Sequence, residues 1–326
     1  MAIKINSIQG GSAMSANSIN RYTRTNPDTN RNPLWNFTVV PPHTFQGTVA
    51  GYATTRTAIE KFPFATDANA TDVGNLSVSR YSLAGQSSEV SGYSSGGFVA
   101  PATFSNIIDK FPFASNGNAT DVGDLTVGRY GPAGQSSDVS GYTSAGTTPP
   151  NSNVIDKFPF ATNANATDVG DLTVSRRIAA GQSSTVSGYT AGAFATSTSS
   201  NVIDKFPFAT NANATDVGDL TVARYGPAGQ SSTVSGYTSG GNAPPNSNVI
   251  DKFPFAADAN ATDVGDLTVA RQSNAGQSST VSGYTSGGYA TVNSNIIDKF
   301  AFATNANATD VGDLSTTNAD MAGQQD

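Results

Sequence analysis

Residues 205–232 read KFPFATNANATDVGDLTVARYGPAGQSS, and this stretch decides the fold class because it recurs along the chain. Its opening Lys-Phe pair occurs six times at intervals of 47 to 49 residues, at Lys61, Lys110, Lys157, Lys205, Lys252 and Lys299. In every copy an Asp follows the Lys by 11 residues, and an Ala-Gly-Gln triplet follows that Asp by 12. Constant spacing over six copies predicts a repeat architecture, in which each unit buries its apolar faces against its neighbours.

The composition favours strands and turns over helices. The 326 residues include 33 Gly and 16 Pro but only two Glu, Glu60 and Glu89. Gly and Pro disfavour helix interiors, whereas the abundant Val and Thr favour strands. The sequence therefore predicts an all-β protein, and the low hydrophobic fraction of 37% suits a fold in which small units stack on one another.

A unit of about 47 residues has the length of a four-stranded β-propeller blade. In the third copy we expect one strand over residues 154–160 and another over residues 169–176, with Leu172 and Val174 on one face of the latter. Residues 180–190 are rich in Gly, Ala and Ser, which suits a hairpin in the crowded centre of a propeller. The repeated Asp, Lys and Arg residues are expected at a solvated blade edge or in salt links between neighbouring blades.

The two ends of the sequence predict how the ring closes. Residues 322–326 match the first part of the Ala-Gly-Gln segment, and residues 3–11 resemble its second part. A blade shared by N- and C-terminal strands would close a ring and remove exposed strand edges. We therefore expect a single seven-bladed propeller over residues 1–326, with a degenerate blade at 1–46 and six regular repeats at 47–326. The alternative is six blades, with residues 1–46 forming an N-terminal arm.

Two resemblances extend this expectation. Residues 222–241 resemble a kelch repeat, with Arg224 at a strand end, a small-residue strand, and Tyr237 followed by Gly240-Gly241. The Trp typical of kelch repeats is replaced by Phe. The stretch at 205–232 also resembles repeats in virion proteins of marine bacteriophages, particularly those that infect cyanobacteria. These resemblances imply a kelch-like propeller displayed on a phage tail or capsid, where it acts in virion structure or host recognition.

Charge and targeting signals narrow the partners. A net charge of −7 disfavours nucleic acid, which would be repelled by an acidic surface. The N-terminal sequence MAIKINSIQGG lacks the apolar stretch of a signal peptide, and no apolar run predicts membrane insertion. We expect a protein assembled in the host cytoplasm and carried in the virion. Its expected partners are other virion proteins or a host-surface glycan or protein, and a second copy of the chain, in a homo-oligomer, is a further candidate.

Catalytic chemistry is not indicated, and no catalytic residue or cofactor is predicted. The single histidine, His43, lies far from any catalytic motif and is expected to be a surface or packing residue. Kelch-type copper oxidases need a cysteine, which this chain lacks. Sialidase-like propellers need Asp boxes that end in Trp, and the only Trp is Trp35. A hydrolase or lyase with its site in the central channel is the weakest alternative.

One repeated turn raises the question of a metal. Residues 67–74 alternate oxygen-bearing side chains around a Gly, as calcium loops do, and Asp67 and Asp258 begin the two most acidic copies. The four other copies begin with Asn, and none carries the distant Glu of an EF-hand. An Asx turn explains the pattern better, so we assign no metal site. The Asn-Ala-Thr triplets in these turns are likewise better explained as turns than as glycosylation sites.

Sequence variation is concentrated in two connections of each repeat. In a meander, the second-to-third connection and the fourth-to-next-first connection emerge on the same face of the propeller. Variable loops on a rigid scaffold are typical of recognition surfaces, although relaxed constraint on exposed loops is the alternative. The predicted binding residues are Tyr81, Phe98, Phe104, Tyr130, Pro149, Arg177, Phe194, Tyr225, Pro245, Gln272 and Tyr289. A bacterial, lectin-like carbohydrate-binding module is the alternative function.

Overall fold

The computed structural model describes residues 22–24, 37–39 and 45–326. The chain divides into two units, Met1–His43 and Thr44–Asp326. Strands β1 (Tyr22–Arg24) and β2 (Phe37–Val39) of the first unit pair antiparallel. The second unit is a β-propeller.

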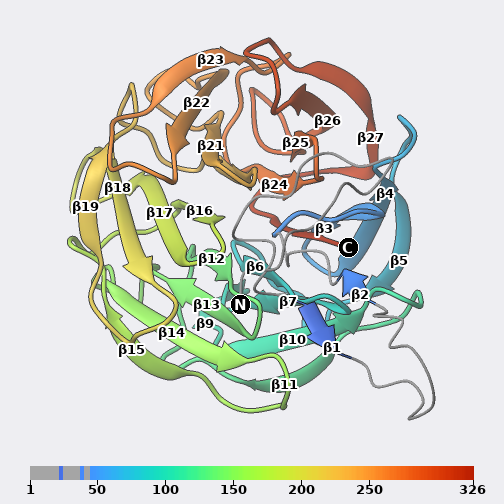
Figure 1. The fold of residues 1–326 in the computed structure, drawn as a ribbon, viewed down its shortest axis with the longest axis vertical. Coiled ribbons are helices and arrows are strands. Elements are labelled where there is room, and N and C mark those ends of the chain that lie inside the picture. The colour runs from blue at the N-terminus through green and yellow to red at the C-terminus, as the bar shows by residue number, and fades with distance from the viewer. Residues whose placement is uncertain (1–21, 25–36, 40–44) are drawn as a thin grey trace, which may run out of the picture. The chain divides into compact units, whose positions relative to one another are not determined.

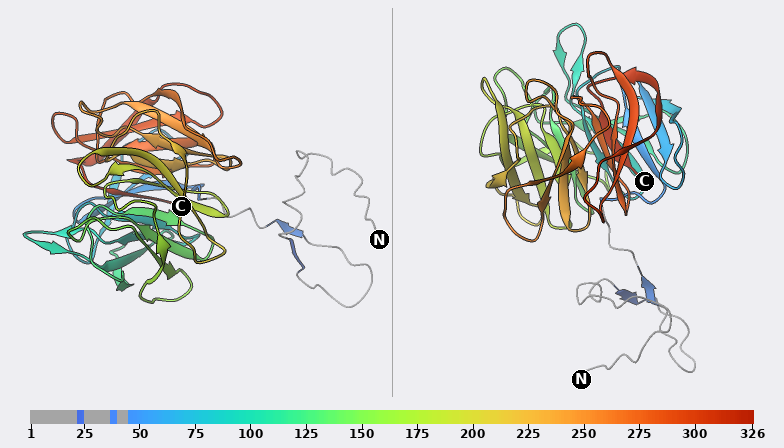
Figure 2. Two further views of the ribbon diagram at one scale, coloured as in Figure 1. Left: turned by 90° about the vertical axis from the view of Figure 1, so that its left-hand side faces the viewer. Right: turned by 90° about the horizontal axis from the view of Figure 1, so that it is seen from above.

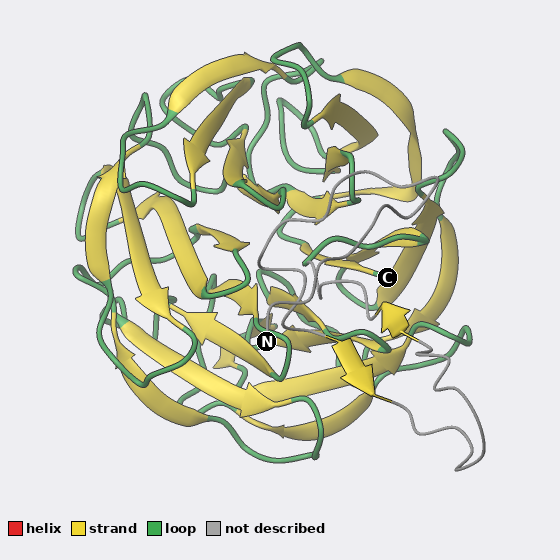
Figure 3. Ribbon diagram, in the orientation of Figure 1, coloured by secondary structure: helices red, strands yellow, loops and turns green. Residues whose placement is uncertain are grey.

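The propeller consists of six four-stranded antiparallel sheets arranged in a ring (Figure 1). We number these blades 1 to 6 in chain order. Strands and loops make up the whole of the described part of the chain, without a helix (Figure 3). No helix that could cross a membrane occurs among the described residues.

In each blade the four strands lie side by side from the central channel outward. Blade 1 contains β28 (Ala322–Gln325), β3 (Ala50–Thr54), β4 (Ala58–Pro63) and β5 (Thr71–Asn75). Blade 2 contains β6 (Ala84–Ser87), β7 (Ser91–Ser95), β10 (Ile107–Pro112) and β11 (Thr120–Asp124). Blade 3 contains β12 (Ala133–Ser136), β13 (Ser140–Ser144), β14 (Val154–Pro159) and β15 (Thr167–Asp171).

The other three blades follow the same order. Blade 4 contains β16 (Ala180–Ser183), β17 (Ser187–Phe194), β18 (Ser199–Pro207) and β19 (Thr215–Asp219). Blade 5 contains β20 (Ala228–Ser231), β21 (Ser235–Ser239), β22 (Val249–Pro254) and β23 (Thr262–Asp266). Blade 6 contains β24 (Ala275–Ser278), β25 (Ser282–Ser286), β26 (Ser294–Ala301) and β27 (Thr309–Asn318).

The prediction of seven blades is wrong, and the six-bladed alternative fits. The C-terminal strand β28 pairs with β3, from Ala322 opposite Thr54 to Gln325 opposite Gly51. One blade is thus completed by strands from opposite ends of the propeller, but its second strand begins at Ala50, not within residues 3–11. Those residues lie outside the described part of the chain. Blades 1 and 6 touch directly, since Gln277 of blade 6 bonds Tyr52 of blade 1, so the ring has no gap for a seventh blade.

Glycines in the innermost strands allow the six blades to meet around a narrow axis. A Cβ atom added to Gly134 of β12 would collide with the carbonyl oxygen of Gly85 in β6. The same collision repeats around the ring, as between Gly181 and Gly134 or Gly323 and Gly276. The Ala-Gly-Gln triplet therefore carries Gly because the backbones of neighbouring blades approach too closely for any side chain.

A closed ring of glutamine hydrogen bonds joins each blade to the next. In every inner strand, the Gln side chain donates from Nε2 to the backbone oxygen of the Tyr in the second strand of the following blade, at 2.9–3.0 Å. All six glutamines are buried. The pairs are Gln86–Tyr142, Gln135–Tyr189, Gln182–Tyr237, Gln230–Tyr284, Gln277–Tyr52 and Gln324–Tyr93.

The same tyrosines stack on phenylalanines of the following blade. Each Tyr ring lies 4.8–4.9 Å, centroid to centroid, from the second Phe of the next Lys-Phe-Pro-Phe segment or its equivalent. Stacked aromatic pairs add to the free energy of burial. Burial raises the pKa of Tyr189 to about 12, as expected for a phenol removed from water. The pairs are Tyr52–Phe113, Tyr93–Phe160, Tyr142–Phe208, Tyr189–Phe255, Tyr237–Phe302 and Tyr284–Phe64.

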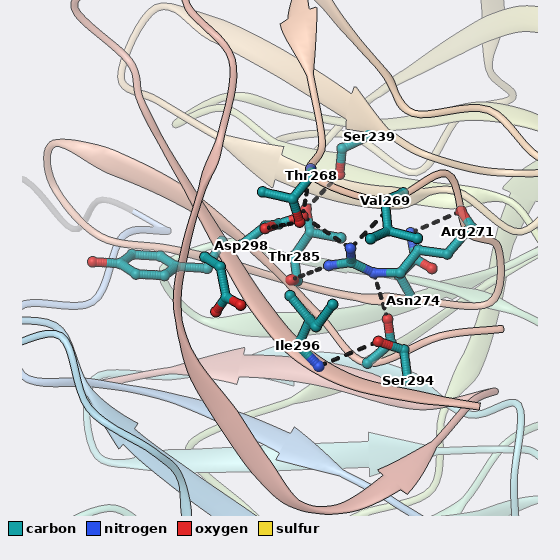
Figure 4. A network of polar contacts seen from close by, with 12 residues as sticks. Ser239, Thr268, Val269, Arg271, Asn274, Thr285, Ser294, Ile296 and Asp298 are labelled. Atoms are coloured by element: carbon teal, nitrogen blue, oxygen red, sulfur yellow. Dashed lines mark hydrogen bonds and ion pairs between the residues drawn. The ribbon is translucent and has the colours of Figure 1, made fainter. Parts of the chain in front are cut away.

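Repeated Arg and Asp residues form buried links between consecutive blades. Arg271, which precedes blade 6, donates from Nη1 to Asp298 of β26 at 2.9 Å and from Nη2 to the Thr285 oxygen at 2.9 Å (Figure 4). Asp298 also accepts hydrogen bonds from the backbone N and Oγ1 of Thr268, which follows β23 of blade 5. Neither side chain of the ion pair is exposed. Burial lowers the pKa of Arg271, and Asp298 opposes that shift.

The strand boundary expected in the third copy is wrong, because the strand ends before residue 172. Strand β15 ends at Asp171, so residues 172–176 do not continue it. Leu172 is buried and Val174 is exposed, so the two do not share a face. Arg176, expected at the end of that strand, is buried against Asp204 of blade 4 at 2.9 Å.

Gly134→Ala is predicted to destabilise the propeller by about 3 kcal/mol, because the new methyl group would overlap backbone that cannot move independently. Gly117→Ala is the matched control. A Cβ at Gly117 meets nothing within 4 Å, and the other five copies already have Ala at this position. The control is expected to leave the free energy of unfolding unchanged or to raise it by up to about 1 kcal/mol. Equilibrium unfolding in guanidinium chloride measures both, and equal stability of the two variants would contradict the packing argument.

Asp298→Asn is predicted to cost about 3–5 kcal/mol, because it leaves the Arg271 cation buried without a counter-charge. Lys299→Met, at the next residue, is the control. The Lys299–Asp67 ion pair is also 2.9 Å long, but its side chains are 30% and 58% exposed, so its loss should cost about 1 kcal/mol or less. Thermal and denaturant unfolding distinguish the two. A small cost for Asp298→Asn would show that the buried pair does not hold the blades together.

Candidate functional site

The central channel is too small to be a substrate site. Its cavity of about 50 Å³ is lined by Gly, Gln and Ser residues of the inner strands. Such a volume holds a water molecule or two, whereas ligand pockets are roughly 300–1,000 Å³. At one end, Phe45 packs against Phe208, and Gln46 and Gly47 hydrogen-bond to Ser231 and Ser278.

The other end of the channel is bounded by a cyclic hydrogen-bonded ring. Six residues, each two positions before an inner strand, have φ between 53° and 68°. Each donates its backbone N–H to the carbonyl oxygen of the equivalent residue in the preceding unit, at 2.6–2.9 Å. The six are Ser82, Gly131, Ile178, Gly226, Ser273 and Asp320. This ring forms a rigid floor beneath the loops on that face.

The repeated Asn-Ala-Thr-Asp turns have structural partners in every blade. In each copy the triplet Asn accepts a hydrogen bond from a backbone N–H of the preceding blade, as Asn165 does from Asp124 at 3.0 Å. The following Asp closes an Asx turn, as Asp168 does with the N–H of Gly170. The side chains of Asp67 and Asp258 pair with Lys299 and Lys205. Within the described residues no group of three or more His, Cys, Asp or Glu side chains is placed to hold a metal ion.

His43 and Trp35, which the sequence analysis considered for catalysis, lie outside the described residues.

The two variable connections of each repeat lie side by side on one face of the propeller, which we call the variable face. Isolated β-bridges join them in blades 2 to 6: Tyr81 to Phe98, Tyr130 to Thr147, Arg177 to Phe194, Tyr225 to Asn242, and Gln272 to Tyr289. The meander argument for a shared face is thus confirmed in its geometry. In blade 1 the second-to-third connection is instead a tight turn, closed by the hydrogen bond from Thr55 N to Ala58 O.

A cavity of about 650 Å³ opens on the variable face over blades 2, 3 and 4. One wall is a hairpin of blade 2, β8 (Phe98–Val99) paired with β9 (Thr103–Phe104). This teal hairpin stands out from the ring in the right-hand view of Figure 2. The lining residues are Tyr81, Phe98, Phe104, Tyr130, Thr147, Pro149, Pro150, Asn151, Ser175, Arg177, Phe194 and Thr196.

Aromatic rings dominate this cavity and contact one another. Phe98 lies 5.4 Å from Tyr81, 5.6 Å from Phe104 and 6.3 Å from Tyr130, measured between ring centroids. Burial raises the pKa of Tyr130. On the opposite side, the Arg177 guanidinium lies over the Phe194 ring, 5.2 Å from its centroid. The cavity therefore presents flat apolar surfaces and one cation.

Seven of the eleven predicted binding residues line this cavity: Tyr81, Phe98, Phe104, Tyr130, Pro149, Arg177 and Phe194. The other four belong to blades 5 and 6 and do not line it. Tyr225 contacts Phe194 at 5.4 Å, and Gln272 and Tyr289 are bridged to each other. Pro245 lies in the corresponding loop of blade 5.

Five lining residues were not among those predicted: Thr147, Pro150, Asn151, Ser175 and Thr196. Thr147 and Pro150 lie in the length-variable segment, so the variation among the repeats is a sequence signal for both residues. Asn151 carries a different signal, since its Nδ2 donates to the Phe194 oxygen at 3.3 Å and ties neighbouring loops together. Only the three-dimensional contact between blades 3 and 4 reveals that role.

A scan against protein-family models found no match, and a search of curated proteins found no relative. The observed repeat architecture is that of a β-propeller. Its resemblance to kelch repeats and to phage virion repeats stays a prediction.

Replacing residues 98–104 with Thr-Thr-Pro-Pro-Asn, the loop of blade 3, is predicted to change the free energy of unfolding by no more than about 1 kcal/mol. Both loops form the same backbone pair with the preceding connection, Phe98 with Tyr81 and Thr147 with Tyr130. The swap should remove two rings of the cavity and leave the blade intact. Circular dichroism and thermal unfolding test this, and global unfolding would show that the hairpin supports the ring.

Proposed function

We propose that the protein is a non-catalytic recognition module, displayed on a phage tail or capsid, that binds host-surface glycan or protein through the variable face. The observation that most supports this proposal is the aromatic cavity over blades 2 to 4. It occurs where the repeats differ, on a scaffold whose blades are otherwise nearly the same. A rigid scaffold with a few distinct loops is how many binding proteins separate stability from specificity.

Three features support a binding role. The cavity volume is in the range for small ligands, its walls are mostly apolar, and aromatic and arginine side chains are frequent binding anchors. The floor beneath it is held by the cyclic ring of backbone hydrogen bonds, so the loops are positioned before a ligand arrives. The resemblance of residues 205–232 to phage virion repeats supports the location on a virion, and other virion proteins are then further partners.

A bacterial, lectin-like module is the second candidate. The observation that favours it is the same set of ring faces, because pyranose rings stack on exposed aromatic side chains. The two candidates share the binding face and differ in where the protein is found.

Two measurements test the proposal. Immunogold electron microscopy of phage particles from the source lysate, with antibody against the purified chain, should label the tail or the capsid. Absence of particle labelling would overturn the virion location and favour the lectin-like alternative.

Fluorescently labelled protein should bind intact host cells, and the loop-swap variant of residues 98–104 should bind at least tenfold more weakly. Gly117→Ala, at a position that does not line the cavity and has open space for a Cβ atom, is the control and should bind as the unaltered protein does. Undiminished binding by the folded loop-swap variant would show that the cavity is not the recognition site.

A further inference from the structure

We propose that the cavity on the variable face binds a carboxylate-bearing carbohydrate, a uronic acid unit, with Arg177 pairing with the carboxylate. This inference rests on the proposed recognition function and names the ligand chemistry of the same site. It follows from the one charged side chain in the cavity wall, from the rings around it, and from the backbone groups that are already paired.

Arg177 differs from every residue at the equivalent position of the other units. Tyr81, Tyr130 and Tyr225 occupy this position in three units, and Gln272 in a fourth. The arginine just before it, Arg176, is buried and paired with Asp204, as its equivalents are with their own Asp residues. Arg177 therefore is not part of the structural ion-pair series.

Arg177 forms no ion pair with any of the described residues. None of the residues lining the cavity is Asp or Glu, and none of the ion pairs among the described residues involves Arg177. Its Nε is shielded from solvent and makes no hydrogen bond there. A guanidinium held without an acid partner in an apolar wall favours an anionic ligand group, and its planar fork matches a carboxylate.

Phe194 fixes the orientation of that fork. The guanidinium lies over the Phe194 ring at 5.2 Å, while Asn151 holds the Phe194 carbonyl from the neighbouring loop at 3.3 Å. A stacked guanidinium loses little additional side-chain freedom when it binds. The site is therefore arranged before the ligand binds.

The ring faces favour a sugar over a peptide as the bearer of the carboxylate. Peptides are commonly recognised by backbone pairing with an exposed strand edge. Here the backbone groups of Tyr81, Tyr130 and Arg177 already pair with Phe98, Thr147 and Phe194. What remains for a ligand is aromatic surface from Tyr81, Phe98 and Tyr130, which suits the apolar face of a pyranose ring.

The net charge of −7 disfavours long polyanions. The cavity, at about 650 Å³, has room for a short oligosaccharide. A short oligosaccharide that contains uronic acid is the ligand that fits both facts.

Isothermal titration calorimetry with the full chain tests the inference. The probes are the trisaccharides of galacturonic, guluronic and mannuronic acid, the methyl ester of each, and triglutamate. At least one triuronide should bind at least tenfold more tightly than its ester. Arg177→Gln should abolish that difference and lower the melting temperature by only a few degrees, because the side chain makes no ion pair in the fold and loses only its contact with the Phe194 ring. Arg177→Lys should restore part of the preference, since it keeps the charge and loses the fork.

Each contrary result has a distinct meaning. If no triuronide binds at millimolar concentration, if the esters bind as tightly, or if Arg177→Gln keeps the preference, the inference is overturned. Triglutamate binding as tightly as the triuronides would overturn the sugar assignment. The proposed function is judged separately by cell and particle labelling. Cell binding that is lost in the loop-swap variant but unaffected by Arg177→Gln would leave that function standing and remove the uronic acid.

Discussion

The structure depends on the close approach of six inner strands around one axis. Each contributes a Gly that brings its backbone against the next strand, and a Gln that donates across the junction to the following blade. Tyrosine stacking and the buried Arg–Asp pairs are further connections between neighbouring blades. Because every layer joins neighbouring blades, a modest hydrophobic content is enough, and stability resides in interfaces between units more than in a single large core.

Much of the fold is predictable from periodicity alone. The constant spacing predicts a propeller, and the small residues of the Ala-Gly-Gln triplet predict the strand nearest its axis. The blade count is harder, because Gly10-Gly11 and Tyr22 resemble a repeat in sequence, and short polar motifs do not reveal whether a sheet forms. The local pattern places Arg176 at a strand end, and the ion pair it forms is not visible there because its partner, Asp204, is 28 residues away. A signal is present in the sequence: Asn318 replaces the Arg in the last copy, and Glu60 replaces the Asp at the position that this Arg would face across the ring closure, in the first copy.

The candidate site was partly predictable for a different reason. Variation against a constant repeat marks residues that the scaffold does not require, so Tyr81, Phe98 and Arg177 stand out in the sequence. Which of the variable residues share a cavity depends on the height of the blade 2 hairpin and on contacts between neighbouring loops. Asn151 illustrates this, since it reaches Phe194 in the next blade. The loops of blades 5 and 6 vary in sequence as much as those of blades 2 to 4, yet Tyr289 of blade 6 does not line the cavity.

Near-identity of the blades also creates a problem of strand exchange. The six inner strands are so similar that each could pair with the second strand of any blade. A chain of equal repeats could therefore close early, omit a unit, or exchange strands with another molecule. Blade 1 differs from the others where this matters. Glu60 reaches the N–H of Ser315, and Gln325 bonds to Phe45, in place of the Asp and Ser of other blades. These contacts occur only at the ring closure. They distinguish the pairing of β28 with β3 from pairing with the second strands of the other five blades, so they specify the register in which the ring is completed.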